Sequence, residues 1–591
     1  MTTELNNTDR GVCHIKKEYI LCIDKKNQEN DTQTNKRSLE HDAGDNHEQD
    51  IKKCRSELEI EKAPKTKDKK RGQNKARPKT FHDDKQLKPC ASIVNITSMD
   101  DISPCQYPNC KFIHDPLTYL KTKKEDIGDE CIVFKLKGRC PRGISCRYGA
   151  SHISHDGFNL IDEQRAKLWI EDTKNILQPS LQTKLQKKQY DFSTSEKLVQ
   201  ALYDIRNGKQ NDNGNTTICN KPSGIITDED LIKLLPREKK TIDWRDKLYL
   251  GPLTTVGNLP FRRICKSYGA DITCGEMALC ESLLKASKQE WALVKRHESE
   301  DLFGAQICGN NPYLITKVAQ VLQENTELDF VDLNLGCPID LVYKQGGGSA
   351  MMLRLSQLEV SVKGASSILN IPFTIKMRTG VYKNKNIAHN IAPKVAEWGA
   401  SLITLHGRSR ESRYTKQADW EYIEQCAKAA SCPIYGNGDI FSYEDYIQKK
   451  QLAPSIQGVM IGRGALIKPW IFTEIKEQKL WDISSSERFE ILKKFTNYGL
   501  EHWGSDTQGV EATRRFMLEW LSFLYRYVPV GLLERPPQVI NERPPLYFGR
   551  DDLESLMASG NCSDWIKISE MLLGPVPDGF VFLPKHKANS Y

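Results

Sequence analysis

The second half of the chain alternates short apolar runs with longer amphipathic stretches. The runs end in glycine, proline or polar residues, as buried parallel strands do, whereas the stretches between them have helical spacing. Eight such runs cover residues 248–253, 272–277, 302–307, 330–335, 373–377, 402–406, 434–436 and 458–461. Eight strands alternating with helices over about 220 residues predict an α/β protein, a (β/α)8 TIM barrel. The competing doubly wound sheet would more often carry Gly-x-Gly-x-x-Gly after an early strand, and the sequence has none.

The regions on either side of the barrel differ from it in composition. Residues 1–85 are polar and poor in apolar side chains, so we expect a disordered tail that buries too little surface to offset the entropy of ordering. Periodic patterns predict helices in the linker, including one over 162–177. The chain then divides into a tail over 1–85, a cysteine-rich module over 86–155, a helical linker over 156–245, the barrel over 246–478 and a C-terminal helical domain over 479–591.

The formal net charge is +8, with lysine concentrated in residues 62–79, which leans towards an anionic partner. The stretch 65–71 fits a nuclear-localisation signal or an arm that touches RNA, and it fits an ordinary solvated tail equally well. The start of the chain lacks the apolar segment of a signal peptide, and no apolar run reaches the roughly 18 residues of a membrane helix. No membrane segment is therefore expected. We also expect a monomer, in the cytoplasm and the nucleus.

Two groups of cysteine and histidine precede the barrel. In each group three cysteines and one histidine are spaced closely enough to surround one ion, which is a Cys3His composition typical of zinc. The first group is Cys90, Cys105, Cys110 and His114, and the second is Cys131, Cys140, Cys146 and His152. A module with so little apolar content needs such a cross-link to fold. His155 is an alternative fourth ligand of the second group.

The two groups resemble CCCH zinc fingers, which are associated with RNA binding. Cations and aromatic residues surround the second group, and together they suit phosphates and unstacked bases: Phe134, Lys135, Lys137, Arg139, Arg142, Arg147 and Tyr148. A purely structural or protein-docking zinc module is the alternative.

Polar and glycine residues gather at the carboxyl ends of the predicted strands, where barrel enzymes carry their chemistry. Each residue has a structural explanation when taken alone, but their joint placement is what a ligand site predicts. The candidates are Pro252, Leu253, Thr254, Gln306, Lys376, His406, Asn437, Gly438, Asp439, Ile461, Gly462 and Arg463. The glycines after the last two strands favour phosphate binding by backbone N–H groups, so we expect a phosphorylated cofactor above Lys376.

Cys337 follows the fourth predicted strand directly, in the sequence Asn334-Leu335-Gly336-Cys337-Pro338. A lone cysteine beside a turn is ordinarily a structural residue. Its neighbours favour a reactive thiol, because the glycine-rich loop 342–349 follows within a few residues and polar strand ends surround it.

The barrel resembles the flavin-dependent tRNA-dihydrouridine synthases. The resemblance is carried by residues 252–254, 258–262, 334–338, 376–380, 406–408, 436–439 and 461–464. It implies FMN, reduced by NADPH, which gives a hydride to C6 of uracil while Cys337 protonates C5. It also implies that the twelve strand-end candidates hold FMN, that Asn334 and Arg408 belong to the uracil pocket, and that loop 342–349 closes over the substrate.

The tandem fingers resemble the branch of this family that acts on the variable-loop uridine at tRNA position 47, with messenger RNA left open as a further substrate. In the tail, Arg514, Arg515 and Arg526 are candidates for phosphate contacts, whereas Trp520 fits a helix core better than a base platform. The alternatives are a free-pyrimidine flavin oxidoreductase and a non-catalytic CCCH RNA-binding protein.

Overall fold

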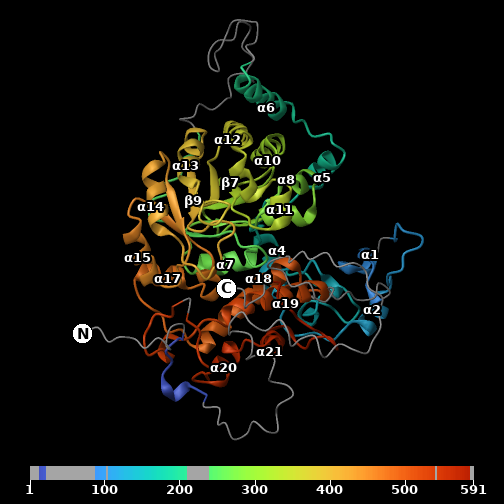
Figure 1. Cartoon of the computed structure of the whole chain (residues 1–591). Coiled ribbons are helices and arrows are strands. Elements are labelled where there is room, and N and C mark those ends of the chain that lie inside the picture. The colour runs from blue at the N-terminus through green and yellow to red at the C-terminus, as the bar shows by residue number, and fades with distance from the viewer. Residues whose placement is uncertain (1–11, 22–86, 102–103, 209–238, 540–541, 586–591) are drawn as a thin grey trace, which may run out of the picture.

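The computed structural model describes residues 12–21, 87–101, 104–208, 239–539 and 542–585. Figure 1 shows a barrel with the helices of the last hundred residues packed beneath it and the cysteine-rich module lying beside those helices. The lysine-rich stretch 62–79 and the candidate localisation signal at 65–71 lie outside the described residues.

The predicted barrel is confirmed. Its eight strands are β2 (Leu248–Leu250), β3 (Thr273–Cys274), β6 (Phe303–Cys308), β7 (Phe330–Leu335), β8 (Phe373–Arg378), β9 (Leu402–His406), β10 (Ile434–Asn437) and β11 (Gly458–Ile461). They pair in parallel in the order β2-β11-β10-β9-β8-β7-β6-β3, and a parallel bridge between Tyr249 and Ile272 closes the ring. A short strand, β4 (Ala278–Leu279), also pairs with β6.

Aromatic side chains fill one end of the barrel. Tyr249, Phe330 and Tyr435 form edge-to-face pairs there, and Trp244 packs against Phe330 with ring centroids 5.7 Å apart. Phe330 is the first residue of β7, Tyr435 is the second of β10, and Trp244 precedes β2, so these side chains fill the amino-terminal end. Any ligand site is therefore left to the opposite end, as in other barrels of this type.

Helices surround the strands: α7 (Leu259–Ser267), α8 (Cys280–Leu284), α9 (Lys288–Trp291), α10 (Pro312–Asn325), α11 (Asp340–Lys344), α12 (Leu355–Ile368), α13 (Ala388–Glu397), α14 (Trp420–Ala429), α15 (Tyr443–Leu452), α16 (Arg463–Ile467) and α17 (Ile471–Glu477). In the described part of the chain, no helix combines the length and apolarity that crossing a membrane requires.

The linker wraps around the outside of the barrel. Its described residues form α4 (Glu163–Leu168), α5 (Pro179–Gln186) and α6 (Ser193–Arg206), and α6 packs on α10 and α12. The single helix expected over 162–177 is wrong: α4 ends at Leu168, and β1 (Thr173–Lys174) pairs antiparallel with β5 (Arg296–His297). Tertiary pairing with the barrel overrides the local helical pattern.

The C-terminal domain is helical, as expected, with α18 (Ser485–Trp503), α19 (Thr507–Leu524), α20 (Asp552–Ala558) and α21 (Cys562–Leu573). Trp520 is a core residue, as expected: it is fully buried, and its indole N–H donates to the carbonyl of Leu466 at 3.0 Å. Its ring also packs edge-to-face on Phe261 of α7. One side chain thus joins α19 to two barrel helices.

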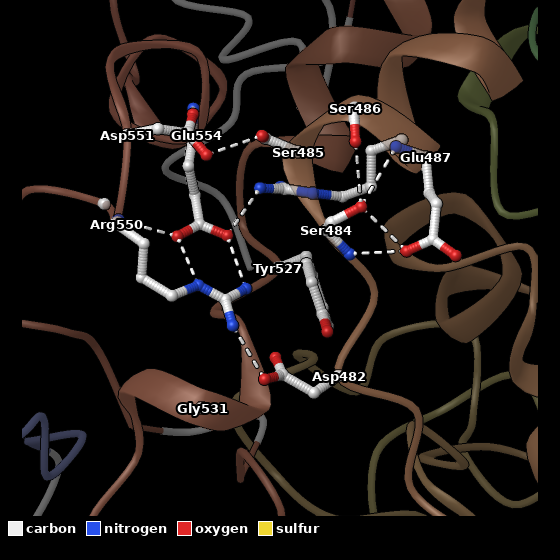
Figure 2. A network of polar contacts seen from close by, with 12 residues as sticks. Asp482, Ser484, Ser485, Ser486, Glu487, Tyr527, Gly531, Arg550, Asp551 and Glu554 are labelled. Carbon is white, nitrogen blue, oxygen red and sulfur yellow. Dashed lines mark hydrogen bonds and ion pairs between the residues drawn. The ribbon is translucent and has the colours of Figure 1, made fainter.

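An ion-pair network around the buried Glu554 joins α18 and α20 of this domain (Figure 2). Glu554 is fully buried and accepts from Arg550 Nη2 at 2.8 Å and from Arg488 Nη2 at 3.3 Å. Arg550 also donates to Asp482 at 2.7 Å, which connects α20 to the segment before α18. Since Glu554 receives two arginines, its desolvation is offset by charge and hydrogen bonds.

Part of the expected disordered tail is folded. Residues 12–21 pack against the C-terminal domain, where Cys13 and Ile15 join Val528, Leu532 and Leu533 in a small apolar cluster. The backbone N–H of Cys13 donates to the carbonyl of Arg543 at 2.8 Å. The apolar residues of this decapeptide are too few to form a core alone, but they suffice when another domain supplies the partner surface.

Candidate functional site

A pocket opens at the carboxyl ends of the barrel strands, and most of the predicted ligand residues line it. These are Pro252, Leu253, Lys376, His406, Asn437, Gly438, Asp439, Ile461, Gly462 and Arg463. Two predicted residues lie elsewhere. Thr254 is exposed beyond the end of β2, and Gln306 is buried inside the barrel beneath the loop that carries Cys337.

Positive charge converges on this pocket. Burial, and next the guanidinium of Arg378, lowers the pKa of Lys376 to about 8. Burial and the same arginine, with Lys376, hold the pKa of His406 far below its usual value, so this imidazole is neutral at pH 7. Within the described residues, the Lys376 ammonium makes no hydrogen bond or ion pair. Cations gathered this closely, with few carboxylates, suit an anionic or electron-rich ligand.

Asp439 is the carboxylate that organises the wall of the pocket. It accepts from Arg408 at 2.6 Å, from Arg463 at 2.8 Å and from the backbone N–H of Ala418 at 2.8 Å. Its φ of 56° follows a φ of 133° at Gly438, so the loop after β10 holds two consecutive residues in unusual conformations. A side chain at Gly438 would also come within 2.6 Å of the Ala418 Cβ. Gly438 therefore lets the backbone of this loop form part of the pocket wall, as close approach by a phosphate requires.

Arg408, expected in the uracil pocket, is buried and occupied. Its guanidinium donates to the Asp439 carboxylate, and its Nε donates to the carbonyl of Lys416 at 2.8 Å. The structure therefore gives Arg408 the task of holding the loop after β9 in place.

Sequence reasoning did not assign a ligand role to several residues that line the pocket, among them Arg378, Tyr414, Phe441 and Met460. Arg378 lies two residues after Lys376, inside the segment 376–380 that carries part of the family resemblance. Tyr414 lies within the polar loop after β9, where a lone aromatic residue was the available signal. Burial alone would raise the pKa of Tyr414, yet Arg378 and Arg463 lower it below its usual value.

A relay of hydrogen bonds runs from the barrel interior to Cys337. The carboxylate of Asp332 accepts from Thr374 at 2.6 Å and from Gln306 Nε2 at 2.7 Å. Gln306 Oε1 then accepts from Asn334 Nδ2 at 2.8 Å, and Asn334 Oδ1 accepts the backbone N–H of Cys337 at 2.8 Å. Gln306 and Asn334, predicted to contact cofactor and base, therefore hold the cysteine loop.

Cys337 is buried, and burial raises the pKa of its thiol above the ordinary value. It packs with Cys308 and Val342, and it does not line the cationic pocket. The loop is connected to that pocket by Arg378, whose Nε donates to the carbonyl of Gly336 at 2.8 Å. The thiol is thus held protonated at neutral pH, at the end of β7 and beside the pocket.

A second cavity, of about 320 Å³, adjoins the cationic pocket. Tyr414, Phe441 and Arg463 line both cavities. The far wall of the second cavity comes from the C-terminal domain, including Phe523 and Tyr525. The helical domain therefore reaches the rim of the barrel site.

Both cysteine–histidine groups come together. In each, the four expected ligand atoms lie within 4.8 Å of one another. The second group is completed by His152, and all four of its ligands are buried. His152 Nδ1 lies 3.0 Å from Asn159 Oδ1, whereas Nε2 is a buried nitrogen without a hydrogen-bond partner in the described structure. Because a partner on Nδ1 fixes the tautomer, Nε2 is left to bind a metal.

The expected RNA face around the second group is wrong in part. Tyr148 is buried, and Phe134 packs on His152 with ring centroids 5.3 Å apart. Arg142 donates to the carbonyl of Trp503, and Arg147 donates to that of Glu125. These four side chains make their contacts within the protein, whereas Lys135 and Arg139 of the expected face are exposed.

Arg514, expected to meet phosphates, is also buried. It donates to Ser569 Oγ at 3.1 Å and to the carbonyl of Leu573 at 2.8 Å, where it joins α19 to α21.

The first group is far more open. Of its ligands, Cys105 and Cys110 are partly exposed and His114 is exposed. Between and beside them stand Tyr107, 73 % exposed, and Phe112, 38 % exposed. Exposed aromatic rings of this kind are side chains on which unstacked bases can sit.

Comparison with known proteins identifies the class. The family model for dihydrouridine synthase (Dus) matches residues 249–522. Together with the relatives described next, this match shows that the chain belongs to the dihydrouridine synthase family. The matched residues include the whole lining of the cationic pocket, whereas both cysteine–histidine groups lie outside them.

Curated relatives match most of the chain. The tRNA-dihydrouridine(47) synthase NAD(P)(+)-like protein of Xenopus laevis is 56% identical over 537 residues, which cover 88% of this chain and 83% of the relative. The protein of the same name from Homo sapiens is 51% identical over 554 residues, covering 88% and 84%. The one from Arabidopsis thaliana is 42% identical over 584 residues, covering 84% of each.

Proposed function

We propose that the protein reduces the C5–C6 double bond of the uridine at tRNA position 47, in the variable loop, to give dihydrouridine. FMN is the cofactor and NADPH the reductant. The observation that carries the proposal is a protonated thiol, Cys337, held beside a cationic barrel pocket in a chain whose relatives are named for this reaction.

FMN suits the pocket for three reasons. The Lys376 ammonium faces it without a partner in the described structure, and Arg463 adds charge beside the phosphate-binding glycines. Gly438 and Gly462 bring backbone to the pocket wall, and His406 is neutral, able to donate or accept a hydrogen bond. When bound and reduced by NADPH, FMN supplies the hydride that C6 of the uracil receives.

Cys337 supplies the proton. Its Sγ–H gives a proton to C5 while C6 gains the hydride, so that the double bond takes up one hydride and one proton. The resulting thiolate regains its proton from water. A thiol whose pKa is raised by burial keeps its proton at neutral pH, which suits a general acid. Asn334 and Gln306 act as positioning residues that hold the Cys337 backbone.

The substrate base must leave its stack to reach the pocket. We propose that the exposed first finger, with Tyr107 and Phe112, helps to hold the RNA, together with the open cavity between barrel and helical domain. Zinc is the ion of both fingers. The protein acts as a monomer in the cytoplasm and the nucleus, and some messenger RNAs are further substrates.

A free pyrimidine is the less favoured substrate, since a small molecule needs no finger. The deciding experiment maps dihydrouridine across total RNA from cells with the protein, without it, and with Cys337→Ala in its place. We expect loss of the modification at tRNA position 47 in the last two. Unchanged dihydrouridine at that position, or a purified protein that binds no flavin, would refute the proposal.

A further inference from the structure

One wall of the second cysteine–histidine group comes from the C-terminal domain. Ser505 stands in the turn between α18 and α19 and is fully buried. Its Oγ lies 3.4 Å from Cys140 Sγ and 3.1 Å from Cys146 Sγ, although 365 and 359 residues of chain separate them. A hydroxyl that touches two metal-binding sulfurs is an outer-sphere contact, of the kind that orients ligands and tunes metal affinity.

Backbone contacts reinforce this junction. The N–H of Arg147 donates to the carbonyl of Ser505 at 2.8 Å, and Cys146 forms an antiparallel bridge with Asp506. The Arg142 guanidinium crosses the turn, donating to the carbonyl of Trp503 at 3.0 Å.

Gly504 lies where the Arg142 side chain passes over the turn. Its φ is 111°, and a Cβ at this position would come within 2.3 Å of Arg142 Nε. The positive φ is therefore what favours glycine where the finger docks, and a Cβ there would also displace the flexible Arg142 side chain.

We propose that the second group is a structural metal site shared by two domains, in which a zinc ion clamps the finger module onto the α18–α19 turn and Ser505 is its outer-sphere positioning residue. With the ion bound, the sulfurs are thiolates, and the Ser505 hydroxyl donates to one of them. Without the ion, three thiols and an imidazole are left buried together, and the turn loses its support.

The metal site also bears on the stability of the helical domain. Its turn begins α19, whose Trp520 is bonded to Leu466 in the barrel helix α16. The second finger therefore contributes to the stability of the domain beside the catalytic pocket. The first group has partly open ligands and lies outside this junction, so the two ions have different tasks. This inference does not depend on the reaction that the barrel performs.

The first test compares matched cysteine variants of the full-length protein. Cys146→Ser removes a ligand of the second group, and Cys110→Ser removes one of the first. We measure zinc per chain by atomic emission and thermal unfolding by tryptophan fluorescence. Each variant should lose one ion, but only Cys146→Ser should lower the melting temperature of the helical domain. Equal shifts in both variants, or none in either, would overturn the clamp.

The second test keeps every ligand in place. Ser505→Ala removes the outer-sphere hydroxyl. Ser522→Ala removes a buried α19 hydroxyl that, among the described residues, bonds only to the Glu519 carbonyl of its own helix. Competition with a chelator measures the affinity of each ion. We expect Ser505→Ala to weaken one of the two ions by about 10- to 100-fold and Ser522→Ala to change neither. If both variants hold zinc equally well, Ser505 has no such role.

Discussion

The side-chain oxygen of Asn334 accepts the backbone N–H of Cys337 at 2.8 Å and that of Gly336 at 3.1 Å. A single amide thus fixes the turn that carries the thiol. Asn334 is itself fixed by Gln306, which is anchored on buried Asp332. The position of the thiol is therefore set from inside the barrel rather than by the surface loop that follows it.

We predict that Cys337→Ala lowers dihydrouridine formation by about 10²- to 10⁴-fold while flavin stays bound, because the change removes a general acid without touching the cationic pocket. Product in purified tRNA and the flavin absorbance report the two effects. Cys308→Ala, a change at the neighbouring buried thiol, is the control and should keep its activity. Full activity in Cys337→Ala would refute the acid assignment.

Asn334→Ala should impair the same step indirectly. Two backbone N–H groups lose their acceptor, which costs about 1–3 kcal/mol of stability. We expect kcat to fall while flavin affinity is unchanged, and Asn334→Asp, which keeps an acceptor oxygen, to recover part of the rate. Equal losses in both variants would mean that the contact with Gln306, rather than the one with Cys337, is what matters.

Because Lys376 titrates near neutral pH, FMN binding should depend on pH. Its pKa of about 8 means that the ammonium is charged below pH 8 and neutral above it. Since the charge attracts the cofactor, FMN affinity of the apoprotein should fall as the pH rises through about 8. Fluorescence titration checks this. In Lys376→Met the FMN affinity should be lower, and its fall near pH 8 should vanish. Lys385→Met, at an exposed lysine of the loop after β8, should keep this pH-dependent step. A step that survives Lys376→Met belongs to another group.

The sequence predicts those features that depend on local patterns. Each barrel strand is an apolar run with its own boundaries, so all eight could be located, and glycine pairs mark the loops after β10 and β11. Tyr414 could not be found in this way. It reaches the pocket only because Arg408 and Asp439 fold the loop after β9 inwards, and that contact is set by tertiary structure.

Errors arise where distant segments meet. The sequence predicts Tyr148 as an exposed aromatic residue of a small finger. In the structure it is buried, and Ser505, more than 350 residues away, lies against the cysteines of that finger. The sequence of residues 12–21 resembles the rest of the polar tail, but in the structure Ile15 packs in a cluster with Leu532. Thr254 is exposed next to Leu253, which lines the pocket, so its contact with a cofactor stays a prediction.

The ion pairs of Figure 2 should dominate the stability of the helical domain. Glu554→Ala leaves the buried guanidinium of Arg488 without its carboxylate, which should cost about 3–5 kcal/mol in urea unfolding. The double change Arg488→Met with Glu554→Met should recover most of that loss, because Arg550 keeps Asp482 as a partner. A double variant as unstable as Glu554→Ala would show that the network is needed for packing as well as for charge.

The two fingers should differ in RNA binding. Tyr107 is exposed beside the first group, whereas Tyr148 is buried beside the second. Tyr107→Ala should weaken tRNA binding by about 1–3 kcal/mol, the usual contribution of one stacked base, while zinc content and melting temperature stay unchanged. Tyr148→Phe, which keeps the buried ring, should leave tRNA affinity intact. Filter-binding measurements on the full-length protein decide the matter. If Tyr107→Ala binds tRNA as tightly as the unmodified chain, the open face of the first finger does not hold a base, and RNA binding must be sought in the cavity shared by Tyr414 and Phe523.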